Sequence, residues 1–272
     1  MPEMAGKEVI MITETARAKI NLTLWVGRKR PDGYHSIDSV MHSISLSDEI
    51  TLEKSNEILL TVLEGDAPAG QENLMVRAAE AFFAVTELEG GVFLTLKKRI
   101  PSGAGMGGGS ADAAAVLRGL SKAYEHPLSK EDLLKVAARI GADVPFFIFG
   151  RTGFVEGIGE IITPLEIPPA SYAVIWPGRG ISTAEIFTAP NLTRDTKSLK
   201  IDILSGKALE IWPNLYGHND LQNVAQELEH RVTEGLGMLA CGTHDARMTG
   251  SGSAVFGVIA DPCSYRLPQL PD

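Results

Sequence analysis

The sequence of 272 residues contains few cysteines, few aromatic residues and fewer basic than acidic side chains. Its two cysteines, Cys241 and Cys263, are too few for a disulfide framework, which favours a reducing compartment. Lysine and arginine number 25 against 34 aspartate and glutamate residues, giving a net charge of −9. Non-specific nucleic-acid binding needs a basic surface, so we expect no nucleic-acid partner. A local pocket for a phosphorylated ligand is compatible with this charge.

Long hydrophobic runs are also missing. No uninterrupted apolar segment approaches the ~20 residues that cross a bilayer. The apolar stretch at residues 9–12 is too short for the core of a signal peptide, and the first 14 residues include three glutamates, which argues against a transit peptide. We therefore expect a cytoplasmic protein with no membrane partner.

Metal-ligand spacings are scarce as well. Cys241 and His244 have a C-x-x-H spacing, which is half of a possible zinc site. No second pair of ligands follows, and structural zinc needs four ligands. We expect ordinary loop residues here and no protein-bound metal.

Short segments rich in valine, isoleucine and phenylalanine alternate with helical patterns, which predicts a mixed α/β fold. One helix is expected after Asn73, a second at residues 111–124, and a third after Ser129, which has capping-box spacing to Asp132 and a stop at Gly141. Strands are expected at residues 9–12, 20–26, 58–62, 92–96, 146–149, 173–175 and 254–259.

The division into domains is less sharply marked. Residues 190–213 are polar and begin and end with proline, which predicts a loop with short helical pieces. Glycines at residues 150–159 mark either a domain junction or hairpin turns. We predict an N-terminal domain at 1–152 and a C-terminal domain at 153–272.

A glycine-rich loop between a predicted strand and a predicted helix is the strongest local signal. The sequence IPSGAGMGGGSADAA places five glycines in the seven positions 103–109. Glycine permits positive φ and close approach of the backbone to a ligand, and a helix start offers free N–H groups and the positive end of its dipole. This arrangement is typical of a phosphate site. Ser110 either caps the helix or coordinates a phosphate or its Mg²⁺.

The spacing of this loop excludes the commonest nucleotide-binding motifs. A P-loop needs a lysine within the loop, and none is present. Gly103, Gly105 and Gly108 satisfy G-x-G-x-x-G, but a dinucleotide-binding fold needs a second strand with an acidic residue about 20 residues further on. A second helix is predicted there instead. The protein-kinase sequences VAIK, HRD and DFG are absent. A plain strand-to-helix turn is the alternative interpretation.

Polar residues beside apolar segments give further candidates. Lys19 and Asn21 share one face of a predicted strand, because side chains two residues apart do. Asp143 lies between a helix stop and an apolar segment, where a carboxylate is costly to bury without a partner. Lys19 is the partner we propose from the sequence. An edge-strand lysine and a helix-terminal turn aspartate are the ordinary alternatives.

Two more segments are candidates for ligand contacts. Tyr34 and His35 follow a P-D-G turn and can stack on and hydrogen-bond to a flat ring, although hairpin packing would also explain them. The sequence MTGSGSAVF, at residues 248–256, is a second loop of glycines and hydroxyl side chains. Together the two glycine loops favour phosphate chemistry more than either does alone.

These segments together resemble the GHMP kinase superfamily of small-molecule kinases. Met106 stands where leucine is more usual and Ala111 where a second serine is common, and the tail after Asp261 does not align. The matching stretches span residues 16–257 and are ARAKINLTL, RPDGYHSIDSVM, ENLMVRAA, IPSGAGMGGGSADAA, IGADVPFFIFGRTGFVEGIGE, GISTAEIF, NDLQNVA and MTGSGSAVFG.

The resemblance implies a two-domain α/β (α+β) fold with the active site in the cleft between the domains. It implies transfer of a phosphoryl group from ATP, expected with Mg²⁺, to the 2-hydroxyl of the methylerythritol part of a cytidine diphosphate sugar alcohol. That reaction belongs to the non-mevalonate isoprenoid pathway. Asp143 then resembles the catalytic base and Lys19 its partner. Such a transfer depends mostly on positioning and charge stabilisation, which one base, one cation and a backbone cradle can supply.

The resemblance also assigns binding roles. Tyr34 and Phe187 resemble the two aromatic rings that stack on opposite faces of the cytosine. His35 resembles the group that recognises the edge of the base. Asn21 and Thr183 are further candidates for substrate contacts, and Asn73 is a candidate for the adenine end of the nucleotide. The residues assigned to the ATP phosphates are Pro101, Ser102, Gly103, Ala104, Gly105, Met106, Gly107, Gly108, Gly109 and Ser110.

Two alternatives stay open at this point. Another GHMP kinase, such as a homoserine kinase, would have no reason to carry Tyr34, His35 and Phe187. A non-catalytic nucleotide or metabolite sensor on the same fold would need neither Lys19 nor Asp143. A monomer and a homodimer are both compatible with the sequence.

Overall fold

The computed structural model describes residues 11–196, 217–259, 262, 263 and 265. These residues form two compact units that are interleaved along the chain. The described part of the first unit comprises residues 11–17, 46–99 and 108–148, and that of the second comprises residues 18–45, 100–107 and the described residues from 149 onward. This division follows spatial proximity, whereas the domains 1–152 and 153–272 are contiguous in sequence and stay a prediction.

Two long strands contribute to both units. Strands β1 (Met11–Lys29) and β2 (His35–Ser55) are neighbours in one sheet, and the boundary between the units falls within each of them. Residues 12–15 and 48–53 alternate between more buried and more exposed positions, whereas residues 18–26 are buried throughout. The continuous burial of residues 18–26 shows that both faces of β1 are covered there.

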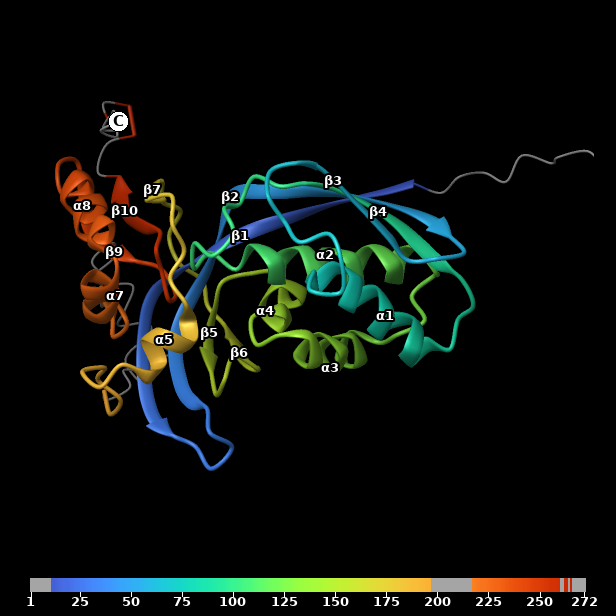
Figure 1. The fold of residues 1–272 in the computed structure, drawn as a ribbon, viewed down its shortest axis with the longest axis horizontal. Helices are drawn as coiled ribbons and strands as arrows, with labels where there is room; N and C mark the ends of the chain where they lie inside the picture. Colours follow the sequence, from blue (N-terminus) through green and yellow to red (C-terminus); the bar gives the residue numbers. More distant parts are fainter. Residues whose placement is uncertain (1–10, 197–216, 260–261, 264, 266–272) are drawn as a thin grey trace, which may run out of the picture. The chain divides into compact units, whose positions relative to one another are not determined.

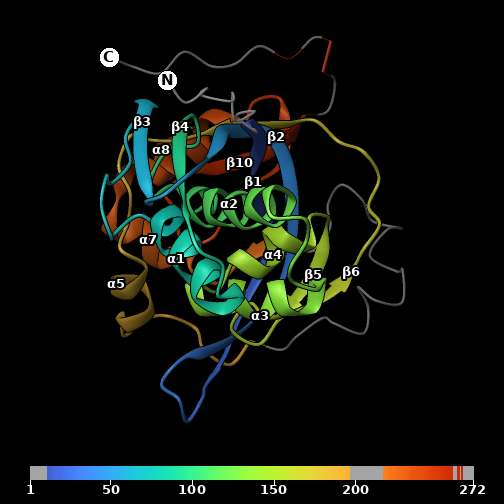
Figure 2. The same ribbon diagram turned by 90° about the vertical axis from the view of Figure 1, so that its right-hand side faces the viewer.

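In the first unit, helices pack on a small sheet. Strand β4 (Gly91–Lys97) pairs antiparallel with residues 49–55 of β2 and parallel with β3 (Leu59–Glu64). Helices α1 (Leu74–Thr86), α2 (Gly108–Ala123), α3 (Lys130–Ile140) and α4 (Val144–Phe149) lie on one side of β3 and β4 in Figure 1. Figure 2 shows α1, α2 and α3 close together from a second direction. Gly119 allows α2 to approach β2, because a Cβ there would lie 2.6 Å from a methyl carbon of Leu52.

The second unit contains the turn of residues 30–34 between β1 and β2, three further short strands and a separate three-stranded sheet. Strand β5 (Gly153–Glu156) pairs with residues 39–41 of β2 and with β6 (Ile161–Pro164), and β8 (His218–Asn219) lies parallel to β1. The separate sheet has the order β7 (Tyr172–Ile175), β10 (Val255–Ile259), β9 (Thr243–Met248). Helix α5 (Thr183–Thr188) follows β7 in the chain.

Two helices cover the three-stranded sheet. Helices α7 (Gln222–Leu228) and α8 (His230–Leu239) lie beside β9 and β10 in Figure 1. The approach of α8 is close, since a Cβ on Gly235 would lie 2.9 Å from a methyl carbon of Val255. Val224, Val232 and Leu239 join the core of this unit. Among the described residues, no helix is both long and apolar enough to span a bilayer.

The three helices predicted from capping and periodicity are confirmed. Asn73 caps α1 and accepts a hydrogen bond from the N–H of Met75, and Ser129 caps α3 by accepting one from the N–H of Asp132. Gly141 terminates α3 in an extended conformation. The strands predicted at 92–96, 173–175 and 254–259 correspond, within one residue at their ends, to β4, β7 and β10. The strand predicted at 58–62 is β3, which ends two residues later, and the one predicted at 20–26 lies inside the much longer β1.

The strand predicted at residues 146–149 is wrong, because these residues form the end of α4. The apolar run VPFF is buried on all sides, so it carries no periodicity that separates strand from helix. Pro145 is compatible with the first turn of a helix, where its missing N–H costs nothing. Asp143 therefore immediately precedes a helix rather than a strand.

The remaining predictions concern loops. Of the glycines in residues 150–159, Gly153, Gly157 and Gly159 belong to the β5–β6 hairpin, and its turn contains Gly157 at φ +76°. Gly150 lies between α4 and β5. Of the predicted loop at 190–213, residues 190–196 lack regular structure and residues 197–213 lie outside the described residues. Residues 9 and 10 of the first predicted strand also lie outside them. Strand β2 was not predicted, because serine and histidine dominate its first half.

Candidate active site

Lys19 is held in the second unit by two oxygen atoms. Its side chain is 3% exposed, and Nζ donates hydrogen bonds to Oδ1 of Asn21 at 2.5 Å and to the carbonyl oxygen of Gly105 at 2.7 Å. The amide of Asn21 also donates to Oγ of Ser39 at 2.8 Å. The predicted common face of Lys19 and Asn21 is therefore confirmed. The buried Asn21 fixes the ammonium group against the glycine loop.

The glycine loop itself is anchored by backbone hydrogen bonds. The N–H of Lys19 donates to the carbonyl of Met106 at 3.0 Å, and the N–H of Ala254 donates to the carbonyl of Ala104 at 3.1 Å. The side chains of Ala104 and Met106 are buried, while Ser102 and Gly103 are exposed. The loop thus directs its apolar side chains into the core of the unit and leaves its glycine backbone at the surface.

The two glycine loops predicted from sequence are in contact. A Cβ on Gly105 would overlap the carbonyl oxygen of Thr249, and a Cβ on Gly250 would lie 3.0 Å from Nζ of Lys19. Oγ1 of Thr249 accepts from the N–H of Asn21 at 3.0 Å and lies 3.2 Å from Oδ1 of Asn21. The amide of Asn219 donates to the carbonyls of Met248 and Gly250. Thr249 and Asn219, which sequence reasoning did not select, therefore support the lysine site.

The conformation of the first loop fits a phosphate-binding role. Gly103, Gly105 and Gly107 have φ values of +70°, +75° and +69°, which side chains with a Cβ rarely adopt. Helix α2 begins at Gly108, so Gly109 and Ser110 lie in its first turn. The N–H groups of a first turn have no partner within the helix and point outward. Phosphate oxygens of a nucleotide are suitable acceptors for them.

Asn73 and Asp143 lie in the first unit. The side chain of Asn73 is engaged locally: Oδ1 accepts from Met75 at 2.9 Å, and Nδ2 donates to the carbonyl of Pro68 at 2.7 Å. Asp143 is half-buried and lies directly before α4. It follows Gly141, whose added Cβ would lie 4.0 Å from Oγ of Ser110. Asp143 thus lies close in sequence to a residue that approaches the start of α2.

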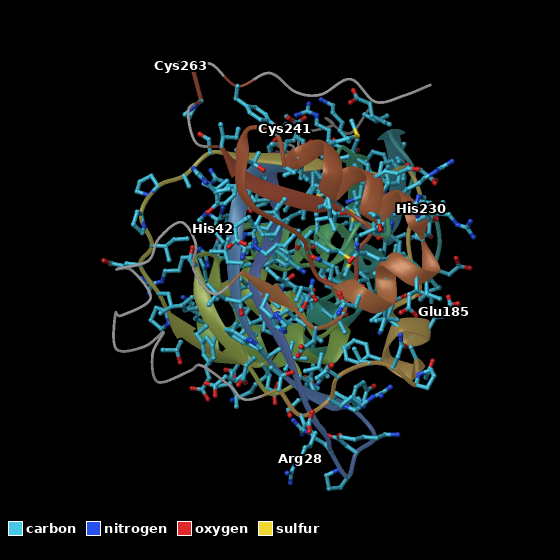
Figure 3. All side chains as sticks on the ribbon, turned by 90° about the vertical axis from the view of Figure 1, so that its left-hand side faces the viewer. Arg28, His42, Glu185, His230, Cys241 and Cys263 are labelled. Carbon is cyan, nitrogen blue, oxygen red and sulfur yellow. The ribbon has the colours of Figure 1, made fainter. Side chains whose placement is uncertain are left out.

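Two aromatic rings of the second unit form a stacked pair. His35 and Phe187 have ring centroids 5.9 Å apart and an interplanar angle of 27°. Nδ1 of His35 lies 3.0 Å from the carbonyl oxygen of Gly27. Tyr34 is 64% exposed at the turn between β1 and β2. Arg28 is near the end of β1, just before this turn, and Figure 3 shows its side chain projecting outward.

Helix α5 connects the aromatic pair to the second glycine loop. Oγ1 of Thr183, its first residue, lies 2.7 Å from Oγ of Ser251. Phe187 is in the last turn of the same helix and packs against the core of the unit. Thr183 and Phe187 are thus brought together by one helix. That helix touches the loop in which Gly250 approaches Lys19.

Sequence reasoning missed a buried cluster of charges in the first unit. Nζ of Lys98 donates to Oδ2 of Asp48 and, at 2.8 Å, to Oδ2 of Asp112, and all three side chains are at most 5% exposed. The N–H of Arg99 donates to Oδ1 of Asp48 at 2.5 Å. The cluster thus connects Lys98 and Arg99, which precede the glycine loop, to Asp112, which follows it. Burial raises the pKa of Asp112 to about 7, with Lys98 opposing the shift and Asp48 adding to it.

We expect Asp112→Asn to change the pH dependence of stability. A carboxyl whose pKa is near 7 when folded and near 3.9 when unfolded binds a proton more tightly in the folded state. The native protein therefore loses stability as pH rises from about 4 to 7. The melting temperature of the variant should therefore rise relative to that of the native protein as the pH increases across that window.

The matched control for this experiment is Asp132→Asn on α3. Hydrogen bonds from Ser129 and Lys135 lower the pKa of Asp132. A carboxylate whose pKa is lowered by folding makes its full contribution to stability at any pH above its pKa in the unfolded chain. The difference in melting temperature between Asp132→Asn and the native protein should therefore stay constant between pH 5 and 8. A constant difference for Asp112→Asn over pH 4–8 would show that Asp112 does not titrate in this window.

The cysteines show no sign of a metal centre in the described ranges. Cys241 and Cys263 are both exposed, and Figure 3 labels them. His244 lies on β9. Among the described residues, no group of three or more His, Cys, Asp or Glu side chains is arranged to hold a metal ion.

Comparison with known proteins identifies the class of this fold and site. Residues 73–151 match the model of the GHMP kinases N terminal domain. The structure of a homoserine kinase from Cytophaga hutchinsonii covers 96% of this chain and 88% of its own, with a TM-score of 0.67 and 18% identity, which shows the shared fold. The chain is a GHMP kinase, an ATP-dependent enzyme that phosphorylates a small molecule.

More similar proteins define the family within that class. A 4-diphosphocytidyl-2-C-methyl-D-erythritol kinase of Polaromonas naphthalenivorans strain CJ2 is 43% identical over 254 residues, which cover 90% of this chain and 85% of that protein. A crystal structure of 4-(cytidine 5'-diphospho)-2C-methyl-D-erythritol kinase has a TM-score of 0.75 and 35% identity, with coverage of 93% and 91%. The chain belongs to the 4-diphosphocytidyl-2-C-methyl-D-erythritol kinase family.

Proposed function

We propose that this enzyme transfers the γ-phosphoryl group of ATP to the 2-hydroxyl of 4-diphosphocytidyl-2-C-methyl-D-erythritol, in the non-mevalonate isoprenoid precursor pathway. The observation that carries the proposal is the connection within the second unit between an aromatic pair and a buried lysine. His35 stacks on Phe187, and α5 links Phe187 through Thr183 to the loop beside Lys19. One end of this arrangement suits a flat base, and the other suits a group that develops negative charge.

In the proposed reaction, Asp143 takes the proton of the substrate hydroxyl as it attacks the phosphorus atom. Lys19 orients Asp143 and offsets the charge that develops during transfer. The Nζ of Lys19 is already fixed by Asn21 and Gly105, so little reorganisation is needed during the reaction. Asn21 and Thr183 are the further proposed substrate contacts.

We propose that the ATP phosphates bind the backbone of residues 101–110, with Asn73 near the adenine end. The positive-φ glycines and the N-terminal turn of α2 support this placement. Mg²⁺ usually keeps water and phosphate ligands, so we expect it to enter with the nucleotide and to neutralise charge on the transferring group. We propose that the hydroxyl of Ser110 contacts this Mg²⁺.

The hydrogen bond of His35 supports a preference for cytosine. A carbonyl oxygen only accepts, so the proton of neutral His35 must be on Nδ1, facing Gly27. Nε2 is then an acceptor. The amino group at position 4 of cytosine can donate to it, whereas the carbonyl at position 4 of uracil would face it lone pair to lone pair. Tyr34 and Phe187 are the proposed stacking rings for the same base.

The experiment that tests this function compares the cytidine substrate with its uridine analogue. Tyr34→Ala and Phe187→Ala should each raise the KM for the cytidine substrate about 5- to 150-fold, since stacking on one aromatic ring is worth about 1–3 kcal/mol. The KM for ATP should change little. His35→Ala should reduce the preference for cytidine, because an unpaired polar group no longer rejects the wrong base.

Melting temperatures separate recognition from packing in these variants. If the three side chains only pack the turn between β1 and β2, their loss lowers the melting temperature and leaves KM unchanged. That result would contradict the cytidine assignment and leave a GHMP kinase of another substrate.

Other small-molecule substrates are less well supported. The homoserine kinase is only 18% identical to this chain, and the 4-diphosphocytidyl-2-C-methyl-D-erythritol kinases are 40–43% identical. A non-catalytic sensor would have no use for the network that fixes Lys19. We propose that the enzyme is cytoplasmic, because its proposed phosphoryl donor is ATP and its two exposed thiols suit a reducing compartment. We also propose that it is either a monomer or a homodimer.

A further inference from the structure

Helix α5 carries two of the proposed substrate contacts, yet it has only six residues. Helices of this length are unstable in isolation, so their geometry depends on tertiary contacts. Ile186 is fully buried and Leu192, just beyond the helix, is 5% exposed, so both anchor the segment in the core. The position of the Phe187 ring therefore depends on how the backbone around these anchors is held.

The two ends of α5 are held differently. At the start, Oγ of Ser182 accepts from the N–H of Glu185 at 3.4 Å, and Thr183 contacts Ser251. At the other end, Oγ1 of Thr188 donates to the carbonyls of Ala184 and Glu185, and the N–H of Ala189 donates to that of Ile186 at 3.2 Å. The carbonyl of Phe187 needs a donor from beyond the helix if this end is to be rigid.

Arg194 supplies that donor. Its Nη2 donates to the carbonyl of Phe187 at 2.9 Å and to that of Ala189 at 2.6 Å, and its Nη1 donates to the carbonyl of Leu192 at 3.0 Å. One planar guanidinium thus binds three carbonyl groups between residues 187 and 192. Its positive charge also lies favourably at the carbonyl end of a helix.

We propose that Arg194 is a positioning residue for recognition of the substrate base: it fixes the backbone of Phe187 so that the ring is already in place when the base arrives. This inference rests on the proposed role of Phe187. Fixing a contact before binding reduces the ordering cost of association and so raises affinity. Arg194 acts through Phe187 and is not proposed to touch the substrate.

Arg194→Ala should raise the KM for the cytidine substrate about 3- to 15-fold, as expected when a contact must be ordered during binding. The kcat and the KM for ATP should stay within about twofold of the native values. Arg194→Lys keeps the charge but lacks the planar fork, so its KM should stay well above the native value. Arg231→Ala is the matched control, since Arg231 donates to the carbonyl of Pro177 at 3.4 Å.

Two further measurements separate this inference from the proposed function. In a Phe187→Ala background, Arg194→Ala should add no further increase in KM, because the ring on which it acts is gone. Hydrogen exchange of the amides at residues 186–192 in the substrate-free protein should be faster in Arg194→Ala than in the native protein. Melting temperatures show whether each variant is folded, and Arg194→Lys serves if Arg194→Ala is not.

Several results would overturn the role of Arg194. These are an unchanged KM, full recovery by Arg194→Lys, additive effects of the two alanine substitutions, or unchanged hydrogen exchange. Full recovery by lysine would indicate long-range attraction of the anionic substrate instead of positioning. If Phe187→Ala itself leaves KM unchanged, the proposed base site fails and the inference fails with it. If Phe187→Ala raises KM and Arg194→Ala does not, only the inference fails.

Discussion

Asp143→Asn is expected to lower kcat about 10²- to 10⁴-fold, the usual effect of losing a general base. Asparagine is nearly the same size as aspartate, so the turn before α4 should be preserved, but it cannot accept the proton of the attacking hydroxyl. The dissociation constant of ATP, measured by calorimetry, should stay within about twofold. The rate should be measured in a single turnover so that product release does not mask the chemical step.

A matched substitution controls for the loss of one carboxylate. Glu131→Gln on α3 removes an 81% exposed carboxylate that pairs with Lys135, and it should leave kcat unchanged. Near-native turnover of a correctly folded Asp143→Asn protein would show that another group takes the proton. A large rise in the ATP dissociation constant would show instead that Asp143 contributes to nucleotide binding.

Lys19→Met is expected to lower kcat about 10²- to 10³-fold, a loss comparable to that of one preorganised charge-stabilising group. Methionine has about the same length as lysine but carries no charge and donates no hydrogen bond. The Nζ bonds to Asn21 and Gly105 would be lost together. Binding of ATP should weaken less than turnover, because the lysine charge matters most while the phosphoryl group is in transit.

Two proteins complete the test of Lys19. Lys97→Met removes a half-exposed lysine that pairs with Glu49 on the sheet of the first unit, and kcat should not change. In a protein that also carries Cys241→Ser and Cys263→Ser, so that no other thiol reacts, Lys19→Cys followed by aminoethylation rebuilds a side chain with a terminal ammonium group. This treatment should recover part of the lost activity. If aminoethylation restores nothing while the melting temperature is native, the charge of Lys19 is not what catalysis requires.

The sequence was most informative where local rules decide the structure. The caps at Asn73 and Ser129 predicted α1 and α3 because each satisfies free N–H groups within its own first turn. The positive φ of Gly103, Gly105 and Gly107 follows from the density of glycines in the loop. The common face of Lys19 and Asn21 follows from the two-residue period of a strand.

The sequence was least informative where burial or distant contacts decide. The run at residues 146–149 is apolar throughout, so only its packing determines that it is helical. The pairing of Lys98 with Asp48 and Asp112 joins residues 50 and 14 positions away, and no motif indicates it. Arg194 lies in a polar loop without a recognisable pattern, and only the folded chain brings its guanidinium to three carbonyl groups.

The most direct test of the central claim is the identity of the product. The protein should be incubated with ATP, Mg²⁺ and 4-diphosphocytidyl-2-C-methyl-D-erythritol, and the products should be followed by ³¹P and ¹³C nuclear magnetic resonance. We predict one ADP for each substrate consumed and one new phosphomonoester, coupled to the carbon that bears the methyl group. Formation of ADP that does not depend on this substrate, or phosphorylation of homoserine or of a different hydroxyl in its place, would contradict the proposed function.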